Sequence, residues 1–148
     1  MKVPKAVVVT TIDHLRTGGR QRCETVVLWL GRRNGDIAEV YEAYRPEQQV
    51  DIDYFRILPE GMRALMSRLR QTRMQILAQV HSHPEAAFHS RADDHWAIVR
   101  HEGALSLVVP DFAAGTSDDN FAEKAVAFRL DTDNAWKEVP FVDVLEIA

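Results

Sequence analysis

The apolar run QILAQV at residues 75–80 leads directly into a polar segment, HSHPEAAFHSRADD, at residues 81–94. A short apolar run of this kind predicts a buried β-strand. If the strand continues through residue 83, His81 and His83 share its two-residue period and project from the same face. Pro84 cannot donate to a strand ladder, so the strand stops there. The fold must therefore place two imidazoles together at the end of a buried strand.

A third metal ligand can come from the residues that follow. Ser90 to Asp93 are expected to restart the chain at the first turn of a helix, which can deliver the Asp93 carboxylate to the strand end. Two histidines and one carboxylate are a ligand set of catalytic zinc, which keeps one position open for a water whose pKa falls to about 7. The single cysteine, Cys23, excludes an internal disulfide and a cage of thiolates. Any metal is therefore expected to be held by histidine and carboxylate.

Each fragment of this pattern also has an explanation that needs no metal. Ser-x-x-Asp ahead of an apolar helix is a capping box, with Ser90 as N-cap and Asp93 reaching back to its amide. Paired histidines such as His81 and His83 are often solvated or hydrogen-bonded to the backbone. The complete pattern, His-x-His-Pro followed after a short loop by Ser-x-x-Asp, is too demanding to arise easily by accident. The combination therefore favours a metal site.

The other polar residues near the motif are expected to have smaller roles. His89 and His95 flank it and are expected at the surface, with a place beside the metal ligands as the alternative. Asp94 points elsewhere on the helix than Asp93 does, so it is not expected to be a ligand.

Length and charge limit the possible functions. The 148 residues suffice to bury one core, so we expect a single domain over residues 1–148. The 18 basic and 22 acidic residues give a net charge of −4, which argues against a surface that follows nucleic-acid phosphates. No apolar run approaches the roughly 18 residues that span a bilayer, and the first residues lack a signal-peptide pattern. We expect a cytoplasmic protein with no nucleic-acid or membrane partner.

Two segments before the motif have strong patterns. Residues 24–31 and 37–44 predict a hairpin, since two β-rich runs are joined across Asn34-Gly35, a pair that tolerates positive φ. Pro59 can open a helix whose apolar stripe is expected to pack in the core. The stripe consists of Leu58, Met62, Leu65, Met66 and Leu69.

The remaining segments have weaker patterns. Residues 6–12 predict a strand or a strand-helix junction, followed by a helical start that Gly18 and Gly19 break. A helix is expected over residues 93–103, ended by Gly103. Further strands are expected at 104–110 and 124–130, and then at 136–141 and 142–147 as a closing meander.

The motif resembles that of the JAMM metalloproteases, also called JAB or MPN-type isopeptidases. Their pattern is a glutamate on an early strand, His-x-His-Pro, a loop of variable length and Ser-x-x-Asp, and HSHPEAAFHSRAD matches every fixed position with a short loop. The resemblance covers roughly residues 20–113. It implies an α/β fold with a mixed, cytidine-deaminase-like sheet flanked by helices. It also implies that His81, His83 and Asp93 bind Zn²⁺ and that Ser90 donates to the reacting water or the oxyanion.

The resemblance further implies that an upstream glutamate is the general base. Glu24 is the leading candidate because it opens the apolar strand ETVVLWLG, where solubility does not explain a charge. Its competitors are Glu39 and Glu42, which suit a solvated strand face, and Glu47 in the polar segment RPEQQ. The family often carries a cysteine after its glutamate, whereas here Cys23 precedes it.

The substrate class also follows from the resemblance. Members mostly cut amide or isopeptide bonds after the C-terminal glycine tail of ubiquitin or another β-grasp protein. Short-loop bacterial members resemble this chain and accompany ubiquitin-like conjugation or sulfur-carrier systems, some in antiphage defence. We therefore expect an enzyme that removes or matures a ubiquitin-like protein; its oligomeric state is left open.

Three other functions remain possible from the sequence. The first is a peptidase that processes a sulfur-carrier protein, and the second is a non-catalytic scaffold with the same fold. The third is a cysteine hydrolase that uses Cys23 with a histidine. A zinc deaminase is disfavoured because the His-x-Glu and Pro-Cys-x-x-Cys elements are absent.

Overall fold

The computed structural model describes residues 1–148 apart from the side chain of Trp96. Its helices and strands, in chain order, are β1 (Lys2–Val3), α1 (Lys5–Gly19), β2 (Val26–Asn34), β3 (Ile37–Tyr44), β4 (Gln48–Val50), β5 (Phe55–Ile57), α2 (Pro59–Thr72), β6 (Gln75–Ser82), α3 (Arg91–Trp96), β7 (Leu105–Val109), the 3₁₀ turn η1 (Asp111–Ala113), α4 (Phe121–Lys124), β8 (Val126–Leu130), β9 (Trp136–Val139), α5 (Phe141–Val144) and β10 (Glu146–Ile147).

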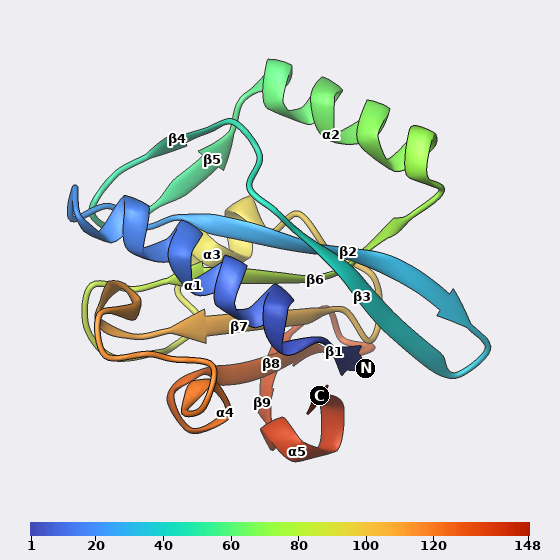
Figure 1. Cartoon of the computed structure of the whole chain (residues 1–148). Coiled ribbons are helices and arrows are strands. Elements are labelled where there is room, and N and C mark those ends of the chain that lie inside the picture. The colour runs from blue at the N-terminus through green and yellow to red at the C-terminus, as the bar shows by residue number, and fades with distance from the viewer.

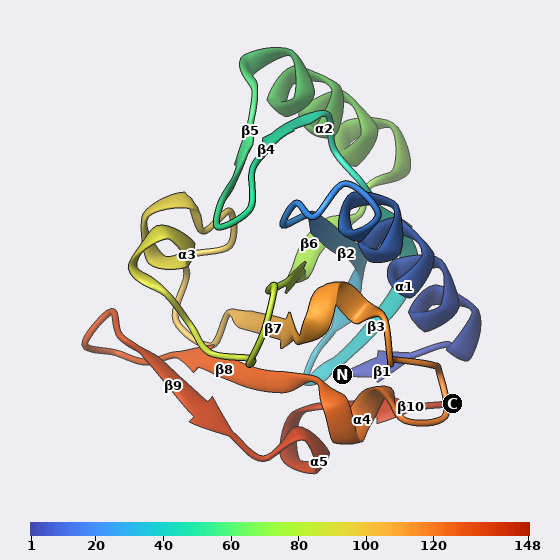
Figure 2. The same ribbon diagram turned by 90° about the vertical axis from the view of Figure 1, so that its left-hand side faces the viewer.

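One mixed sheet of eight strands organises the molecule, in the order β10-β1-β3-β2-β6-β7-β8-β9, and β4 and β5 form a separate hairpin (Figures 1 and 2). The pairs β6–β7, β1–β3 and β1–β10 are parallel, and the other neighbours are antiparallel. The mixed sheet flanked by helices that the sequence predicts is confirmed. Among the described residues, no helix combines the length and apolarity needed to cross a membrane.

Both faces of the central strands are buried. On one face, Val8 and Leu15 of α1 pack in a cluster with Trp29 of β2. On the other face, Phe55 of β5 and Leu65 of α2 pack in a second cluster with side chains of β2. This two-sided burial explains why the first half of β2 is apolar at every position instead of alternating.

The pairing of β2 sets the position of the motif. The predicted hairpin is confirmed, with Asn34 opposite Ile37 and Gly35 at φ +59°. A bulge lies between Leu30 and Gly31, and a Cβ on Gly31 would lie 2.0 Å from the Glu39 carbonyl oxygen, so only glycine fits. On its other side β2 runs antiparallel to β6 with Val26 opposite His81. The start of β2 therefore meets the end of β6.

The expectation of a strand at residues 6–12 is wrong, since the segment belongs to helix α1, which continues through Gly18 and Gly19. The β-branched run gives a strand-like composition, but its buried residues follow a helical period on the face toward the sheet. The glycines remain helical because the helix end packs closely: a Cβ on Gly18 would lie 1.8 Å from Thr25 Oγ1. Close packing here outweighs low helix propensity.

Helix α3 is shorter than the predicted helix at 93–103. It ends at Trp96, and the Gln79 side-chain carbonyl accepts hydrogen bonds from the amides of Ile98 and Val99. A buried side chain of β6 thus replaces the helical carbonyls as the partner of these amides. Gly103 lies at φ +79° in the turn before β7, after the helix has already ended.

Two other expectations need correction. In the stripe of α2, Leu65 is buried, but Met62 and Met66 are 36% and 49% exposed, because only one edge of the stripe faces the second core cluster. The closing meander is also wrong beyond β9. Residues 141–144 form helix α5, and β10 pairs with β1 at the opposite edge of the sheet instead of with β9.

Candidate metal centre

The structure brings His81, His83 and Asp93 together at the end of β6. Asp93 Oδ1 lies 3.2 Å from His81 Nε2, and Asp93 Oδ2 lies 3.0 Å from His83 Nε2. All three residues are buried, and one ligand atom of each lies within 4.8 Å of the others. The shared parity expected of the two histidines thus places both rings against one carboxylate.

The first turn of α3 holds that carboxylate in place. Ser90 Oγ accepts a hydrogen bond from the Asp93 amide at 3.1 Å, and the Ser90 amide donates to Asp93 Oδ2 at 2.6 Å. This reciprocal pair is a capping box. The capping and metal-site interpretations of Ser-x-x-Asp are therefore compatible, because the cap fixes the direction in which Asp93 points.

The unpaired atoms of the cluster fit a metal ion. Among the described residues, His81 Nδ1 and Nε2 and Asp93 Oδ1 are buried without a hydrogen-bond partner, although His81 Nε2 and Asp93 Oδ1 approach to 3.2 Å. Buried polar atoms are seldom left unpaired because desolvation without a partner is unfavourable. Two imidazole nitrogens and a carboxylate oxygen suit a divalent transition metal. The donor set and its unpaired atoms thus agree.

The three side chains are electrostatically coupled. Burial alone would raise the pKa of Asp93, but the neighbouring His81 and His83 rings and the Ser90 amide outweigh it and hold the pKa well below its ordinary range. Burial lowers the pKa of His83, but the hydrogen bond and charge of Asp93 outweigh burial, so that pKa is raised. Without metal, the ionised Asp93 carboxylate thus favours the charged form of the neighbouring His83 ring.

Glu24 reaches the same cluster from another part of the chain. Its Oε1 lies 3.8 Å from His83 Nε2, and its side chain is 3% exposed. Burial, aided by the charges of Asp93 and Asp53 and opposed by His83, raises the pKa of Glu24 to about 8. Oε2 is buried and has no hydrogen-bond partner. Glu24 thus combines an unpaired oxygen with a position beside a candidate ligand.

The competing glutamates lie elsewhere. Glu42 pairs with Arg68 of α2 at 2.9 Å, and Glu39 accepts a hydrogen bond from the Tyr41 hydroxyl. Glu47 is exposed. None of the three has an interaction with the cluster among the contacts of the described residues.

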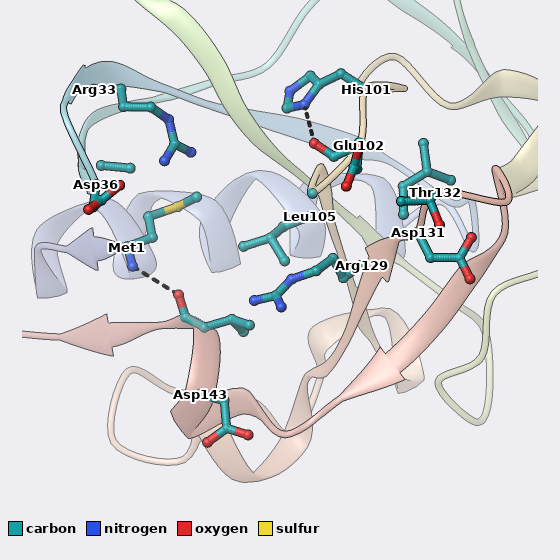
Figure 3. A pocket seen from close by; sticks show the side chains of 14 residues that line it. Met1, Arg33, Asp36, His101, Glu102, Leu105, Arg129, Asp131, Thr132 and Asp143 are labelled. Atoms are coloured by element: carbon teal, nitrogen blue, oxygen red, sulfur yellow. Dashed lines mark hydrogen bonds between the residues drawn. The ribbon is translucent and has the colours of Figure 1, made fainter.

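A cleft of about 440 Å³ opens in front of the cluster and is lined by Glu24, His83 and Ser90 among others. A wider cavity of about 690 Å³ lies elsewhere, with Arg33 and Arg129 near Met1 at its sides (Figure 3). No ligand of the cluster lines the wider cavity, and neither does Glu24. The cleft is therefore the opening that belongs to the candidate site.

Backbone contacts hold His83 in position. Its amide donates to the Val109 carbonyl at 2.9 Å, and its carbonyl accepts from the Phe112 amide at 2.8 Å. Phe112 belongs to η1, whose three residues all have left-handed φ, at 53°, 50° and 61°. Arg16 of α1 donates to the Ala113 carbonyl at 3.1 Å and so connects α1 to this turn.

Sequence reasoning missed two residues that support the site. His89, expected at the surface, is half-buried: its ring stacks on Trp136 at 4.8 Å and lies 6.2 Å from the His81 ring. Burial first, and then the charge of His81, lowers the pKa of His89 to about 4. Its partner Trp136 is remote in sequence, so no local pattern identifies it. Gln79 is the other, and a polar residue two positions before His81 in an apolar strand was its signal.

Comparison with known proteins shows which family the chain belongs to. The family model described as prokaryotic homologs of the JAB domain matches residues 6–121. The chain is 37% identical over 142 residues to the probable metalloprotease y4jG of Sinorhizobium fredii, an alignment that covers 93% of this chain and 86% of that protein.

Two solved structures share its fold. The first is the solution structure of a protein from Desulfitobacterium hafniense, with a TM-score of 0.73 at 20% sequence identity. The match covers 100% of this chain and 93% of that one. A JAB1/MPN domain protein from Archaeoglobus fulgidus has a TM-score of 0.54 at 16% identity, with 100% of this chain and 99% of that one covered. With the sequence match over most of its length, the chain belongs to the prokaryotic JAB family within the JAB/MPN group.

Proposed function

We propose that this protein is a cytoplasmic zinc-dependent peptidase or isopeptidase that cuts after the C-terminal glycine tail of a ubiquitin-like protein. The observation that carries the proposal is the convergence of two imidazoles, one carboxylate and the unpaired Glu24 carboxyl at one cleft. The name of the Sinorhizobium fredii relative, probable metalloprotease, agrees with this chemistry.

His81, His83 and Asp93 would hold the ion. Bound by these residues, zinc would supply a positive charge that would polarise the scissile carbonyl and would lower the pKa of a water molecule to about 7. Glu24 takes the proton of the attacking water on its free oxygen and returns it to the departing amine. Without metal, burial raises the pKa of Glu24 to about 8, and a bound cation would favour the ionised carboxylate that the first step requires.

Ser90 has a hydroxyl available for the oxyanion. Its oxygen accepts from the Asp93 amide, so the O–H remains a free donor at the wall of the cleft. A donor of this kind contributes about 2.7 to 4 kcal/mol in comparable acyl-transfer sites. The same side chain thus caps α3 and serves the reaction.

The substrate class is supported by family membership. Glycine has no side chain, so a glycine tail can approach a crowded metal site, and an extended tail can be held by main-chain hydrogen bonds to a sheet edge. Processing of a sulfur-carrier protein uses the same chemistry and is an alternative biological role.

Elemental analysis and a cleavage assay test the proposal. We expect one zinc per chain, loss of zinc in Asp93→Asn, and retained zinc in Asp94→Asn, whose side chain pairs with Arg100 outside the cluster. Glu24→Gln is expected to keep zinc and to cleave a Gly-terminated ubiquitin-like fusion about 100-fold more slowly or worse.

Cys23→Ser separates this mechanism from a cysteine hydrolase. The Cys23 thiol lies 3.4 Å from the Gln21 carbonyl oxygen, and we expect the variant to retain activity. Cleavage that survives a chelator and disappears in Cys23→Ser would refute the metal mechanism. A scaffold would bind no zinc and cleave no fusion.

A further inference from the structure

The cleft in front of Glu24 has one apolar side. Phe88 is 54% exposed, although no core requires it there, and its ring stands edge-on to the His83 ring with centroids 4.6 Å apart at 84°. Pro84 and Ala92 line the cleft beside it. Together with Pro84 and Ala92, the exposed ring gives the cleft a small apolar wall that a ligand can cover. This wall fits the aliphatic part of a substrate side chain.

The rim of the cleft, in contrast, carries acidic side chains. Asp53, from the turn between β4 and β5, and Glu85, from the loop after Pro84, are exposed and line the same cleft. Neither side chain makes a hydrogen bond or an ion pair among the contacts of the described residues. Among the described residues that line the cleft, Arg91 is the only lysine or arginine, against the carboxyls of Asp53 and Glu85.

Asp53 is fixed relative to the reacting groups. The Glu24 amide donates to the Asp51 carbonyl at 2.7 Å, and the Asp51 amide donates to the Tyr54 carbonyl at 2.9 Å. The turn that carries Asp53 is therefore tied directly to Glu24. Glu85 is tied on the other side, since its carbonyl accepts from the Asp111 amide at 3.0 Å.

A further observation also indicates a ligand in this cleft. Glu24 lines the cleft with only 3% of its surface exposed, and its Oε2 has no hydrogen-bond partner among the described residues. We propose that the cleft selects a substrate carrying a lysine or arginine side chain close to the bond that is cut, with its stem against Phe88 and its charged end between Asp53 and Glu85. Lysine and arginine combine an apolar stem with a charged end, as these two surfaces require. The inference rests on the proposed function and specifies its substrate.

The basic side chain can come from either side of the bond. We would compare quenched fluorescent peptides that carry lysine, norleucine or glutamate on the acyl side of a Gly-Gly pair, and a second set with the same residues on the amine side. Norleucine keeps the lysine stem without its charge, so the lysine-to-norleucine ratio of kcat/KM isolates the rim carboxylates. The peptide set in which lysine is preferred over norleucine shows whether the basic side chain lies on the acyl side or the amine side of the cut bond.

We expect Asp53→Asn and Glu85→Gln each to lower this ratio by about 2- to 5-fold, the range of exposed ion pairs. Salt should lower the ratio too. Phe88→Ala should lower kcat/KM for the lysine and norleucine peptides alike. Asp36→Asn, an exposed acid in the β2–β3 turn outside the cleft, is the matched control and should keep the ratio.

The outcomes separate this inference from the proposed function. Equal kcat/KM for lysine and norleucine, or a preference for glutamate through Arg91, overturns the inference even if cleavage remains chelator-sensitive and dependent on Glu24. Fluorescence polarisation measures binding of the same peptides independently of turnover. Lysine-selective binding that needs Asp53 and Glu85, without any cleavage, supports the cleft's selectivity and refutes the peptidase. Absence of both cleavage and lysine-selective binding overturns both.

Discussion

Replacing Glu24 with glutamine should make the metal-free protein more stable. Burial raises the pKa of the Glu24 carboxyl from an ordinary 4.5 to about 8. Between these values the unfolded chain releases its proton while the folded protein retains it. The free energy of unfolding therefore falls as the pH rises from 4.5 toward 8.

The size of this loss of stability follows from the interval between the unfolded pKa and the working pH. Each pH unit corresponds to about 1.4 kcal/mol, so by pH 7 the ionisable carboxyl has lowered the free energy of unfolding by about 3 kcal/mol. Glutamine cannot ionise and escapes this loss. For a chain of this length, about 3 kcal/mol corresponds to a rise in Tm of about 6 to 12 °C.

Calorimetry on chelator-treated protein tests this expectation. The Tm of Glu24→Gln should exceed that of the unmodified protein at pH 7, and the two should converge as the pH falls below about 4.5, where glutamate becomes protonated in both states. Glu47→Gln, at an exposed position, should change neither value. A divalent metal should reduce the difference in Tm between Glu24→Gln and the unmodified protein, because a nearby cation favours the carboxylate. An equal gap at both pH values, or none at pH 7, refutes the reasoning.

Three further predictions concern the support of the site. Without metal, the raised pKa of His83 gives stability that is present below about pH 6.5 and is lost as the pH rises through the folded value, so thermal melts of His83→Ala should lose this alkaline decline. In Gln79→Leu the amides of Ile98 and Val99 lose their partner, and urea denaturation should show a loss of about 2 to 4 kcal/mol. A Cβ on Gly19 would lie 2.6 Å from Phe112 Cβ, so Gly19→Ala should lower both Tm and zinc occupancy; unchanged values of both would contradict the role of this contact.

Local patterns predict the parts of this fold that depend on neighbours in sequence. The hairpin across Asn34-Gly35 and the strand β6, which carries His81, were predictable because turn chemistry and apolar runs act over a few residues. The segment at 6–12 was not, since a β-branched composition favours a strand and only packing on the sheet makes it helical. Tertiary contact overrides propensity there.

The same distinction applies to the candidate site. His81, His83 and Asp93 lie within one short pattern, so sequence alone identifies them as possible ligands. The place of Glu24 depends on the register in which Val26 faces His81, which no local pattern fixes. For this reason the sequence left several glutamates open.

The left-handed turn at η1 links the candidate metal centre to α1, a helix that contributes none of the three candidate ligands. Non-glycine residues at such φ values are strained by about 1 to 3 kcal/mol each and persist only when their surroundings hold them. Here Arg16 of α1 holds the turn from one side, and the His83 carbonyl holds it from the other. Undocking of α1 is thus coupled to loosening of His83 through this turn. By reciprocity of linkage, a metal that favours the ordered His83 must also favour docked α1, so its binding should also slow amide hydrogen exchange near Arg16.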